Sequence, residues 1–395
     1  RITIHRKLWC ALYFFHKLHS LTIKSCTVKK VLLFFTLMIA LSLSVFSQEK
    51  NNIAVIGYFA GRSTALDSFP IQKLTHLIFS FCHLHENKLW VDHATDTACI
   101  QKMVSFKQKY PSLKIILSLG GWGGCKDCSE AFSTRKGRKT FARSTRYLME
   151  YFHTDGIDLD WEYPVIAGYP GHLYSIEDKE NFTALIKTLR KKLGKKYEIS
   201  FAAGGFSRYI DSSIDWKKVI KNVDKVNLMT YDLVHGASKV SGHHTPLYST
   251  QKQIESTDNA VNRLISAGVP SKKIILGAAF YGRMFEVTDT INNGLYLPAS
   301  FYHGISYSRL YDSVSVTNGF VQYWDSVANA PYAFNVQRKI QVTYDDSLSI
   351  ARKTEYVIKK NLGGIMFWQL MDDRFTDGLL DVIDKTKTTF KANGQ

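Results

Sequence analysis

Several features that would place this 395-residue chain in a special class are missing from it. It shows no internal repeat, no low-complexity tract and no appended binding module, which argues against a repeat protein, a disordered chain or a multi-module protein. Its longest apolar run, about 16 residues, is short for a membrane span. It has only one Cys-x-x-Cys pair, which does not support a zinc ribbon. These absences point to one folded unit.

The chain also lacks an initiating Met, and residues 1–47 do not resemble part of a fold. A Lys-Lys pair at 29–30 precedes the apolar run from Val31 to Phe46, and the residues before Gln48 are small enough for cleavage. We predict that residues 1–47 are a leader with a secretory signal peptide, and that residues 48–395 are secreted or periplasmic in a bacterium. No stable membrane anchor is expected after cleavage. Our hypothesis for the start is an alternative bacterial start codon near Val28.

Basic residues outnumber acidic ones, 51 to 34, which gives a formal charge of +17. The predicted leader carries seven basic residues and no acidic one, so the mature chain is nearer +10. The densest basic run, Lys187 to Lys196, is interleaved with leucines at helical spacing, as on the solvated face of a helix that packs on a core. Nucleic-acid binding is therefore not expected, whereas a basic surface would suit an acidic matrix.

Four cysteines follow the predicted leader, and an exported chain with four cysteines suggests two disulfides. Of the three possible connectivities we expect the near pairs, Cys82 with Cys99 and Cys125 with Cys128. The spacing of Cys125 and Cys128 also fits a redox motif or half of a zinc site.

Short apolar runs alternate with longer amphipathic stretches, which is typical of a parallel α/β fold. Eight strands with their helices predict a (β/α)8 (TIM) barrel, and a doubly wound open sheet is the alternative. The predicted strands are 53–59, 77–81, 115–119, 156–163, 197–203, 225–230, 273–280 and 365–370. The predicted helices are 98–110, 134–153, 177–193, 257–267 and 346–361.

One interval breaks this alternation. Between Tyr281 and Tyr344 the chain is rich in Tyr, Ser, Asn and Gly, with short β-prone pieces such as Phe320–Trp324. We predict that about 284–340 forms a small α+β insertion domain between strand 7 and helix 7 of the barrel.

The most unusual segment runs from Asp155 to Pro164 and places four carboxylates in a predicted strand. Because strand side chains alternate with a period of two, Asp158, Asp160 and Glu162 point to one face and the apolar residues between them to the other. Burying three acids on one face is costly, so proteins keep such clusters mainly where chemistry uses them. An acidic edge strand and a divalent-metal site are the alternatives.

The Asp-x-x-Asp-x-Asp-x-Glu pattern of this segment resembles the signature of family 18 glycoside hydrolases, the chitinases and their relatives. Two other segments resemble family elements, and two more residues of interest lie at the end of the seventh predicted strand and within the eighth. These are Ser118-Leu119-Gly120-Gly121 (Ser-x-Gly-Gly), Met229-Thr230-Tyr231-Asp232 (Met-x-Tyr-Asp), Tyr281 in Phe280–Arg283, and Trp368. The resemblance covers Tyr58 to Asp372 and matches the chitinase branch that carries an insertion.

The resemblance implies a substrate-assisted mechanism, in which the substrate's own 2-acetamido oxygen attacks the anomeric carbon and forms an oxazolinium ion. Glu162 is then the acid that protonates the glycosidic oxygen, so a raised pKa is expected there. Asp160 holds the acetamido N–H, Asp158 shares a proton with Asp160, and Tyr231 holds the acetamido oxygen. Asp155 is expected to be structural.

The resemblance also suggests which residues contact the sugars. Trp368 is the expected hydrophobic floor beneath the sugar at the cleavage point, and Tyr58 and Trp122 are further aromatic platforms. The remaining expected contacts are Met229, Asp232, Tyr281 and Arg283, and the expected structural residues are Ser118, Gly120 and Gly121. A buried structural tyrosine and a core tryptophan are the alternative interpretations of Tyr231 and Trp368.

The resemblance therefore implies a chitinase that hydrolyses β-1,4 bonds of chitin or chito-oligosaccharides, without a metal or cofactor, and we expect it to be a monomer. An endo-β-N-acetylglucosaminidase acting on N-glycan cores shares the acidic motif and is an alternative. A non-catalytic chitin-binding lectin is another, although the presence of Glu162, Asp160 and Tyr231 argues against it. A metal-dependent barrel enzyme is the third.

Overall fold

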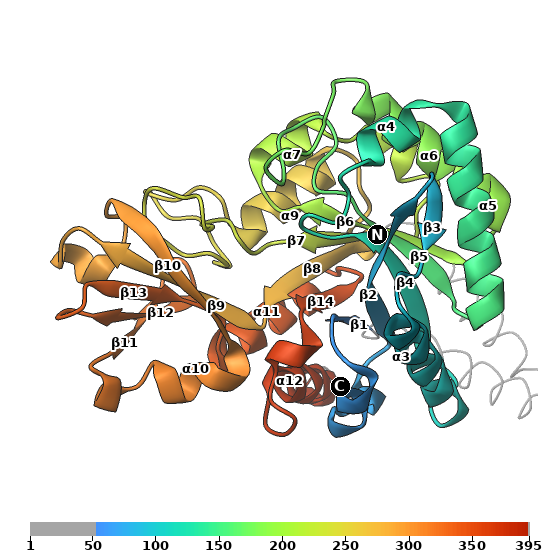
Figure 1. Cartoon of the computed structure of the whole chain (residues 1–395). Helices are drawn as coiled ribbons and strands as arrows, with labels where there is room; N and C mark the ends of the chain where they lie inside the picture. The colour runs from blue at the N-terminus through green and yellow to red at the C-terminus, as the bar shows by residue number, and fades with distance from the viewer. Residues whose placement is uncertain (1–52, 394–395) are drawn as a thin grey trace, which may run out of the picture. The chain divides into compact units, whose positions relative to one another are not determined.

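In the computed structural model, which describes residues 53–393, eight parallel strands form a closed barrel (Figure 1). β1 pairs in parallel with both β14 and β2, and the second of these pairings closes the ring. The predicted (β/α)8 barrel is therefore confirmed, and the open sheet is excluded. In spatial order the strands are β1 (Ala54–Phe59), β14 (Gly364–Trp368), β8 (Ile274–Ala279), β7 (Lys225–Met229), β6 (Glu198–Gly204), β5 (Gly156–Asp160), β4 (Lys114–Gly120) and β2 (His76–His85).

Helices lie between the strands along the chain and pack around the barrel (Figure 1). The α-helices of the barrel are α3 (Ala94–Ser105), α4 (Cys128–Ser133), α5 (Arg135–Phe152), α6 (Asp178–Leu193), α7 (Ser207–Ser212), α8 (Trp216–Val219), α9 (Thr257–Ser266), α11 (Ser347–Lys359) and α12 (Leu379–Asn393). Short 3₁₀ helices are η2 (Ser63–Ser68), η3 (Ile71–Lys73), η4 (Phe106–Gln108), η5 (Ser271–Lys273), η6 (Ile291–Gly294), η7 (Val316–Asn318) and η8 (Leu370–Asp372).

The local sequence explains where α5 and α6 begin and end, within one residue of the prediction at each end. The side-chain oxygen of Thr134 accepts a hydrogen bond from the N–H of Gly137 and caps the first turn of α5. The helix stops where His153 adopts a left-handed conformation with φ of 59°. α6 ends before Gly194, whose φ is 69°, a region that glycine enters without a steric penalty.

Several predicted element boundaries are wrong. The strand expected at 156–163 ends at Asp160, so Glu162 lies beyond it. The helix expected at 98–110 begins at Ala94, because His93 and Asp96 form a capping box, and its last predicted turn is the 3₁₀ helix η4. Strand β2 continues to His85 because it forms a hairpin with the short strand β3 (Lys88–Trp90). Four barrel helices, α4, α7, α8 and α12, were not predicted from the sequence.

The barrel has two apolar layers because neighbouring residues of each strand point to opposite faces. Inward-facing residues such as Ile56, Ile116 and Met366 fill the barrel. Outward-facing residues such as Ile157 and Leu159 join the larger core between the strands and the helices.

A second, antiparallel sheet lies between β8 and α11 and has its own small core (Figure 1). Its strands, in spatial order, are β10 (Ala299–Ser306), β9 (Tyr281–Val287), β13 (Ile340–Thr343), β12 (Ala330–Asn335) and β11 (Val321–Asp325), with α10 (Tyr307–Ser313) beside them. The strands thus run from Tyr281 to Thr343, slightly wider than the interval 284–340 named from the sequence.

A buried ion pair joins the second sheet to the barrel. Lys353 of α11 donates to both carboxylate oxygens of Asp345, at 2.6 and 2.8 Å, and neither side chain is exposed. Asp345 follows β13 and also accepts from the N–H of Ala279, the last residue of β8, at 3.1 Å. Because Lys353 further donates to Thr245 at 2.6 Å, the loop after β7 is tied to the same point.

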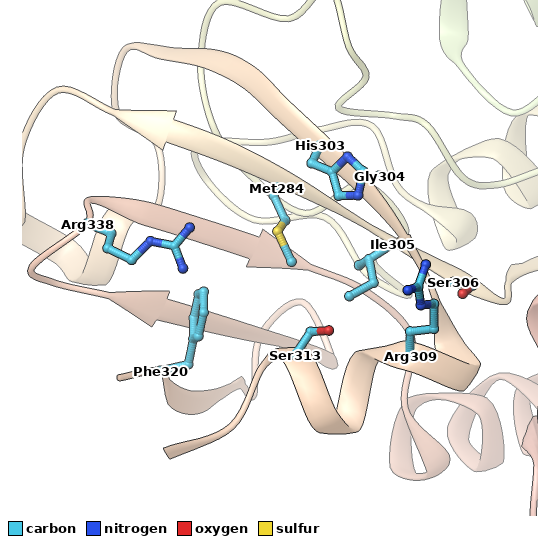
Figure 2. Close-up of a pocket in the computed structure, with 9 residues that line it drawn as sticks. All are labelled: Met284, His303, Gly304, Ile305, Ser306, Arg309, Ser313, Phe320 and Arg338. Atoms are coloured by element: carbon cyan, nitrogen blue, oxygen red, sulfur yellow. The ribbon is translucent and has the colours of Figure 1, made fainter. Parts of the chain in front are cut away.

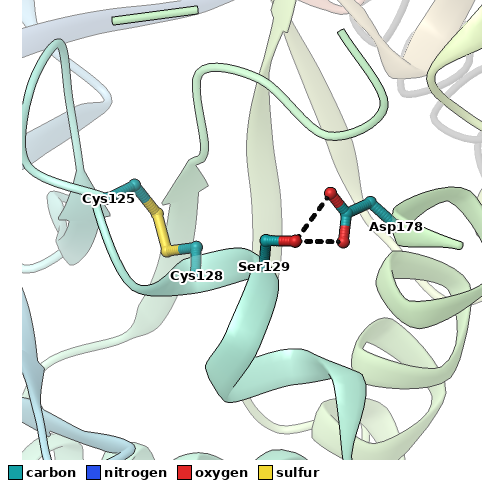
Figure 3. The surroundings of a disulfide bond; sticks show 4 residues. All are labelled: Cys125, Cys128, Ser129 and Asp178. Atoms are coloured by element: carbon teal, nitrogen blue, oxygen red, sulfur yellow. Dashed lines mark hydrogen bonds between the residues drawn. A yellow bond between two sulfur atoms is a disulfide. The ribbon is translucent and has the colours of Figure 1, made fainter. Parts of the chain in front are cut away.

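The predicted cysteine pairing is half wrong. Cys125 and Cys128 form a disulfide with a Cα–Cα distance of 5.2 Å, at the start of α4 (Figure 3). The predicted Cys82–Cys99 bridge is absent, since both thiols are free and buried. Cys82 lies on β2 in the main core, whereas Cys99 lies on α3 and its thiol donates to the carbonyl oxygen of Gly61 at 3.7 Å. Burial raises the pKa of the Cys99 thiol to about 11, which makes it unreactive.

The leader and signal peptide predicted over residues 1–47 lie outside the described residues. Within residues 53–393, no helix is both long and apolar enough to cross a bilayer.

Candidate active site

The acidic segment places its carboxylates as the period-two pattern predicts. Asp158 and Asp160 face the interior of the barrel, whereas Ile157, Leu159 and Trp161 pack outward against the helices. The acids therefore gather at the carboxyl end of β5, where active sites of (β/α)8 barrels lie. The alternative of an exposed acidic edge strand is excluded, because β5 pairs with β4 on one side and β6 on the other.

Asp158 is surrounded by hydrogen-bond donors from four other strands. Its Oδ2 accepts from the hydroxyls of Tyr58 and Ser118, both at 3.0 Å. Its Oδ1 accepts from the Ser200 hydroxyl at 2.6 Å and from the Asn227 amide at 3.0 Å. Burial raises the pKa of Asp158, and these four donors oppose that shift by stabilising the carboxylate.

Ser200 and Asn227 were missed by the sequence analysis. Each is a fully or almost fully buried polar residue in an otherwise apolar strand, β6 and β7 respectively. A polar residue at an inward position of a barrel strand was the available signal, because buried polar groups need a partner.

Asp160 differs sharply from its neighbour. It is only 4% exposed, and its Oδ1 has no hydrogen-bond partner. Burial raises its pKa well above the ordinary value, and the nearby carboxylates of Glu162 and Asp158 raise it further. The raised pKa favours the protonated form of Asp160, and its unpartnered Oδ1 is available to a ligand.

Glu162 lies two residues farther along, just beyond β5, and is partly exposed. Burial raises its pKa to about 7, with a hydrogen bond involving Tyr163 lowering it and the charge of Asp232 raising it. A carboxyl group with this pKa holds a proton near neutral pH and can also release it, which is what a general acid requires.

The Met229–Asp232 segment places a tyrosine and a charged pair beside the acids. The Tyr231 hydroxyl has only a weak partner among the described residues, the Met366 sulfur at 3.9 Å, so no strong hydrogen bond fixes it in the core. Asp232 pairs with Arg283 through both guanidinium nitrogens Nε and Nη2, the latter at 2.5 Å from Oδ2.

Buried His244 lies next to the Asp232–Arg283 pair, with its Nδ1 3.6 Å from Asp232 Oδ1. Burial alone would raise the pKa of Asp232, but the two hydrogen bonds from Arg283, together with the nearby His244, hold it well below its ordinary value. Tyr281 completes the group, with its ring 6.2 Å from that of Tyr231. Asp232 therefore stays ionised and forms an ion pair with Arg283. Its negative charge contributes to the raised pKa of Glu162.

Trp368, at the end of β14, is partly exposed and lies in an aromatic cluster at the barrel mouth. Phe81 stacks on it with ring centroids 5.5 Å apart, and Tyr58 lies 6.0 Å away. Phe81 was not named from the sequence. The stacking fixes the plane of the indole, and the partial exposure distinguishes Trp368 from an ordinary core tryptophan.

The Ser118–Gly121 segment brings β4 close to β5, as the paired glycines predict. The N–H of Gly121 donates to the carbonyl oxygen of Asp160 at 2.9 Å. Gly120 has φ of 106°, and a Cβ there would lie 2.3 Å from the same oxygen. A side chain at this position would displace the strand that carries the acids.

The other residues named from the sequence lie at the mouth or in the barrel. Trp122 is 59% exposed and contacts Tyr169 edge-on, with ring centroids 5.6 Å apart. Met229 packs inside the barrel. Asp155 comes just before β5, at the end of the strand away from the other acids. It pairs with Lys107 at 2.6 Å and accepts a hydrogen bond from a backbone N–H of β4, as expected for a structural residue.

A hollow of about 310 Å³ opens elsewhere, in the second sheet (Figure 2). Met284, Ile305 and Phe320 give it apolar walls, and Arg309 and Arg338 lie at its edges. None of the acidic residues lines it, so we do not assign the reaction to it. Within the described residues there is also no group of three or more His, Cys, Asp or Glu side chains arranged to hold a metal ion.

Comparisons with known proteins agree on one family. A family model described as "Glycosyl hydrolases family 18" matches residues 54–373. Chitinase A1 of Niallia circulans is 34% identical over 299 residues, which are 70% of this chain but only 43% of that protein. Chitinase B of Serratia marcescens is 28% identical over 419 residues, covering 84% of this chain and 83% of that protein.

A solved structure resembles the fold as well. It is that of a glycoside hydrolase family 18 N-acetylglucosaminidase from Paenibacillus barengoltzii, with 37% sequence identity and a TM-score of 0.79. The match covers 85% of this chain and 100% of that chain.

Proposed function

The chain belongs to glycosyl hydrolase family 18, and on that premise we propose that it hydrolyses β-1,4 bonds of chitin or chito-oligosaccharides with retention at the anomeric carbon. The observation that carries the proposal is the graded series of three acids at the carboxyl end of β5, two on the strand and Glu162 just beyond it. Asp158 is held by four donors, Asp160 has a raised pKa and an unpartnered Oδ1, and Glu162 is partly exposed with a pKa of about 7.

Glu162 is the proposed general acid. Its raised pKa keeps it protonated near neutral pH, so it donates its proton to the glycosidic oxygen as the bond to the leaving sugar breaks. After the leaving sugar departs, the Glu162 carboxylate takes a proton from water, which attacks the anomeric carbon. The same residue thus acts first as an acid and then as a base.

The nucleophile in this proposal belongs to the substrate. The carbonyl oxygen of the 2-acetamido group bonds to the anomeric carbon while the glycosidic bond breaks, giving an oxazolinium ion. Water then opens this ring from the face that the leaving sugar occupied. Two inversions at one carbon give overall retention.

Asp160 and Tyr231 are proposed to position the acetamido group. A buried acceptor without a partner costs free energy, and the unpartnered Oδ1 of Asp160 gains one when it accepts the acetamido N–H. The Tyr231 hydroxyl, weakly held by Met366 in the free protein, donates to the acetamido oxygen. Asp158 orients Asp160 and shares its proton.

The test is product analysis by NMR at early times, with purified protein and a chitin hexamer. Wild-type protein is expected to release products that are initially β-anomeric, and Glu162→Gln is expected to release none. Products that are initially α-anomeric would contradict retention. Tight binding without turnover by the wild type would favour a lectin, and faster cleavage of an N-glycan core would favour an endo-β-N-acetylglucosaminidase.

A second candidate is the release of single N-acetylglucosamine units from chain ends. It is favoured by the likeness to the Paenibacillus barengoltzii N-acetylglucosaminidase, which this chain matches over that protein's full length. The same hexamer experiment separates the two activities. Monomer together with pentamer as the first products would support the second candidate, whereas dimers, trimers and tetramers would support the first.

Export is part of the same proposal, because the substrate is an insoluble extracellular polymer. The apolar run at Val31–Phe46 is the proposed signal sequence. N-terminal sequencing of protein from the culture medium is expected to give an end near Gln48. A mature end well upstream of Val45 would contradict this assignment.

A further inference from the structure

Positive charge is concentrated on one side of the described chain. Helices α5 and α6 with the turn residues Lys195 and Lys196 hold 13 basic and 3 acidic residues. Residues 53–395 hold 43 basic and 33 acidic residues in all, so the rest of this stretch has 30 of each. The whole excess of positive charge therefore lies on α5, α6, Lys195 and Lys196, which we call the basic flank.

Most cations of the basic flank are exposed and without a carboxylate partner. Of the ten that are exposed, Arg146 pairs with Glu150 at 2.7 Å within α5. The other nine form no ion pair with any residue of the described part of the chain. They are Arg135, Lys136, Lys139, Arg143, Lys187, Lys191, Lys192, Lys195 and Lys196. Such an excess repels itself, and an anionic partner would relieve the repulsion.

The two helices present these cations as one continuous and rigid surface. α5 and α6 lie next to each other on the barrel (Figure 1), and the Arg146 guanidinium reaches across to the carbonyl oxygen of Lys192 at 3.3 Å. Both helices bury their apolar sides, with Phe141 and Leu185 among the fully buried residues. Because the apolar sides are fixed in the core, the charged sides always face outward.

Two aromatic rings accompany the charges. Tyr147 and Tyr151 lie one turn apart on α5 and are 66% and 58% exposed. Their rings stack at 6.2 Å between centroids with 19° between the planes. Tyrosine offers a large flat contact area with few rotatable bonds and a hydroxyl for hydrogen bonding. No other large apolar side chain is exposed on these two helices.

We propose that the basic flank binds an acidic polysaccharide, one bearing carboxylate or sulfate groups, at a place separate from the active site. The cations pair with its anionic groups, and the two tyrosines pack against its sugar rings. Barrel helices run opposite to the strands, so the last turns of α5 and α6 lie toward the amino end of the barrel. A polymer bound there leaves the acids at the carboxyl end of β5 accessible.

The proposal rests on the proposed function in one respect. On the proposed function the chain is exported and binds a neutral polysaccharide, and an acidic polysaccharide is the polyanion that shares the sugar rings of that substrate. The surface itself argues against two other polyanions. A helix that lies on a membrane exposes Trp, Phe or Leu on an apolar face, and here those faces are buried. A helix that reads DNA protrudes far enough to enter a groove, whereas α5 and α6 lie packed side by side on the barrel.

The test is a binding titration of the full protein with polygalacturonate, beside neutral dextran, at low and high salt. The triple variant Lys187→Gln/Lys191→Gln/Lys192→Gln is expected to bind polygalacturonate about tenfold more weakly at low salt, with a shallower salt dependence. The matched control is Lys109→Gln/Lys239→Gln/Lys272→Gln, which removes three exposed lysines from other sides. Its affinity is expected to stay within about twofold of wild type.

The tyrosines are tested by Tyr147→Ser/Tyr151→Ser, which is expected to weaken binding several-fold without changing the salt dependence. Equal losses in the triple variant and its control, or no binding by wild type, would overturn the proposal. Tighter binding to duplex DNA or to anionic phospholipid vesicles, lost in the triple variant, would assign the flank to that partner instead. Hydrolysis of chito-oligosaccharides by all these variants is measured in parallel, so that failure of the proposed function is seen separately from failure of binding.

Discussion

The two ends of the barrel hold buried carboxylates in opposite electrostatic surroundings. At the amino end, Glu198 of β6 accepts a hydrogen bond from His76 at 3.2 Å and pairs with Lys114 at 2.8 Å and Lys225 at 2.7 Å. At the carboxyl end, Asp160 has no cation within 4.0 Å among the described residues, and its neighbours are other carboxylates. Both side chains are less than a tenth exposed.

The pKa values of these groups move in opposite directions. Burial alone would raise the pKa of Glu198, but the hydrogen bond from His76 and the charges of the two lysines hold it well below its ordinary value. Burial raises the pKa of Asp160, and nothing positive opposes it. The comparison teaches that partners, and not burial, decide whether a carboxyl group stabilises the barrel or keeps a proton for chemistry.

The largest expected effect comes from replacing a glutamate by glutamine at the carboxyl end of the barrel, with the same replacement at the amino end as the control. Glu162→Gln removes the proposed acid and is expected to lower kcat by about 10³-fold, because a general acid contributes on the order of 10² to 10⁴. Glu198→Gln is the matched change and is expected to keep kcat within about threefold of wild type. Activity of Glu162→Gln above a few percent of wild type would rule out the acid assignment.

The amino end is expected to show the larger stability effect. Glu198→Gln leaves Lys114 and Lys225 without their counter-charge, which is expected to lower the free energy of unfolding by about 3 kcal/mol at pH 7. The lowered pKa of Glu198 stabilises the fold above pH about 4.5, and this contribution is lost as the pH falls through the folded-state value. Urea unfolding of wild type and Glu198→Gln at pH 7 and pH 3 measures this contribution. A difference in the free energy of unfolding that is the same at both pH values would contradict the ion-pair explanation.

A third comparison sets two tyrosine hydroxyls against each other. Tyr231→Phe is expected to lower kcat by about 10²-fold with little change in Tm, because its hydroxyl has only the weak Met366 contact in the free protein. Tyr356→Phe is the control, since that hydroxyl donates to Asp258 at 2.7 Å, and it is expected to cost about 1 kcal/mol of stability without lowering kcat. Equal losses of activity and stability in Tyr231→Phe would favour a core role.

The sequence predicted the barrel and the orientation of the acidic strand because both follow from periodicity. Asp158 and Asp160 face inward for the same reason that Ile157 and Leu159 face outward, and no long-range information is needed. The donors around Asp158 were not predicted, because Ser200 lies on β6 and Asn227 on β7, and the register in which these strands pair beside β5 is not given by the local sequence.

Other misses have similar causes. The stacking of Phe81 on Trp368 joins β2 to β14, which are almost 290 residues apart in the chain. The Cys82–Cys99 bridge was expected from short spacing, but the two residues belong to a strand and a helix whose thiols face different neighbours. Spacing along the chain does not fix the direction of a side chain in space.

The smallest expected effect is a pH dependence that has opposite signs at the two ends. The pKa of Glu162 is raised from its ordinary value to about 7, so the folded state binds a proton that the unfolded state releases between about pH 4.5 and pH 7. Glu162 therefore lowers stability as the pH rises through this window, whereas the stabilisation by Glu198 increases with pH and is complete above the unfolded-state pKa of about 4.5. Glu162→Gln is expected to be up to about 2 kcal/mol more stable than wild type at pH 8 and equal to it at pH 4, as measured by urea unfolding. If the two proteins differ equally at both pH values, the raised pKa of Glu162 is wrong, and its suitability as the acid falls with it.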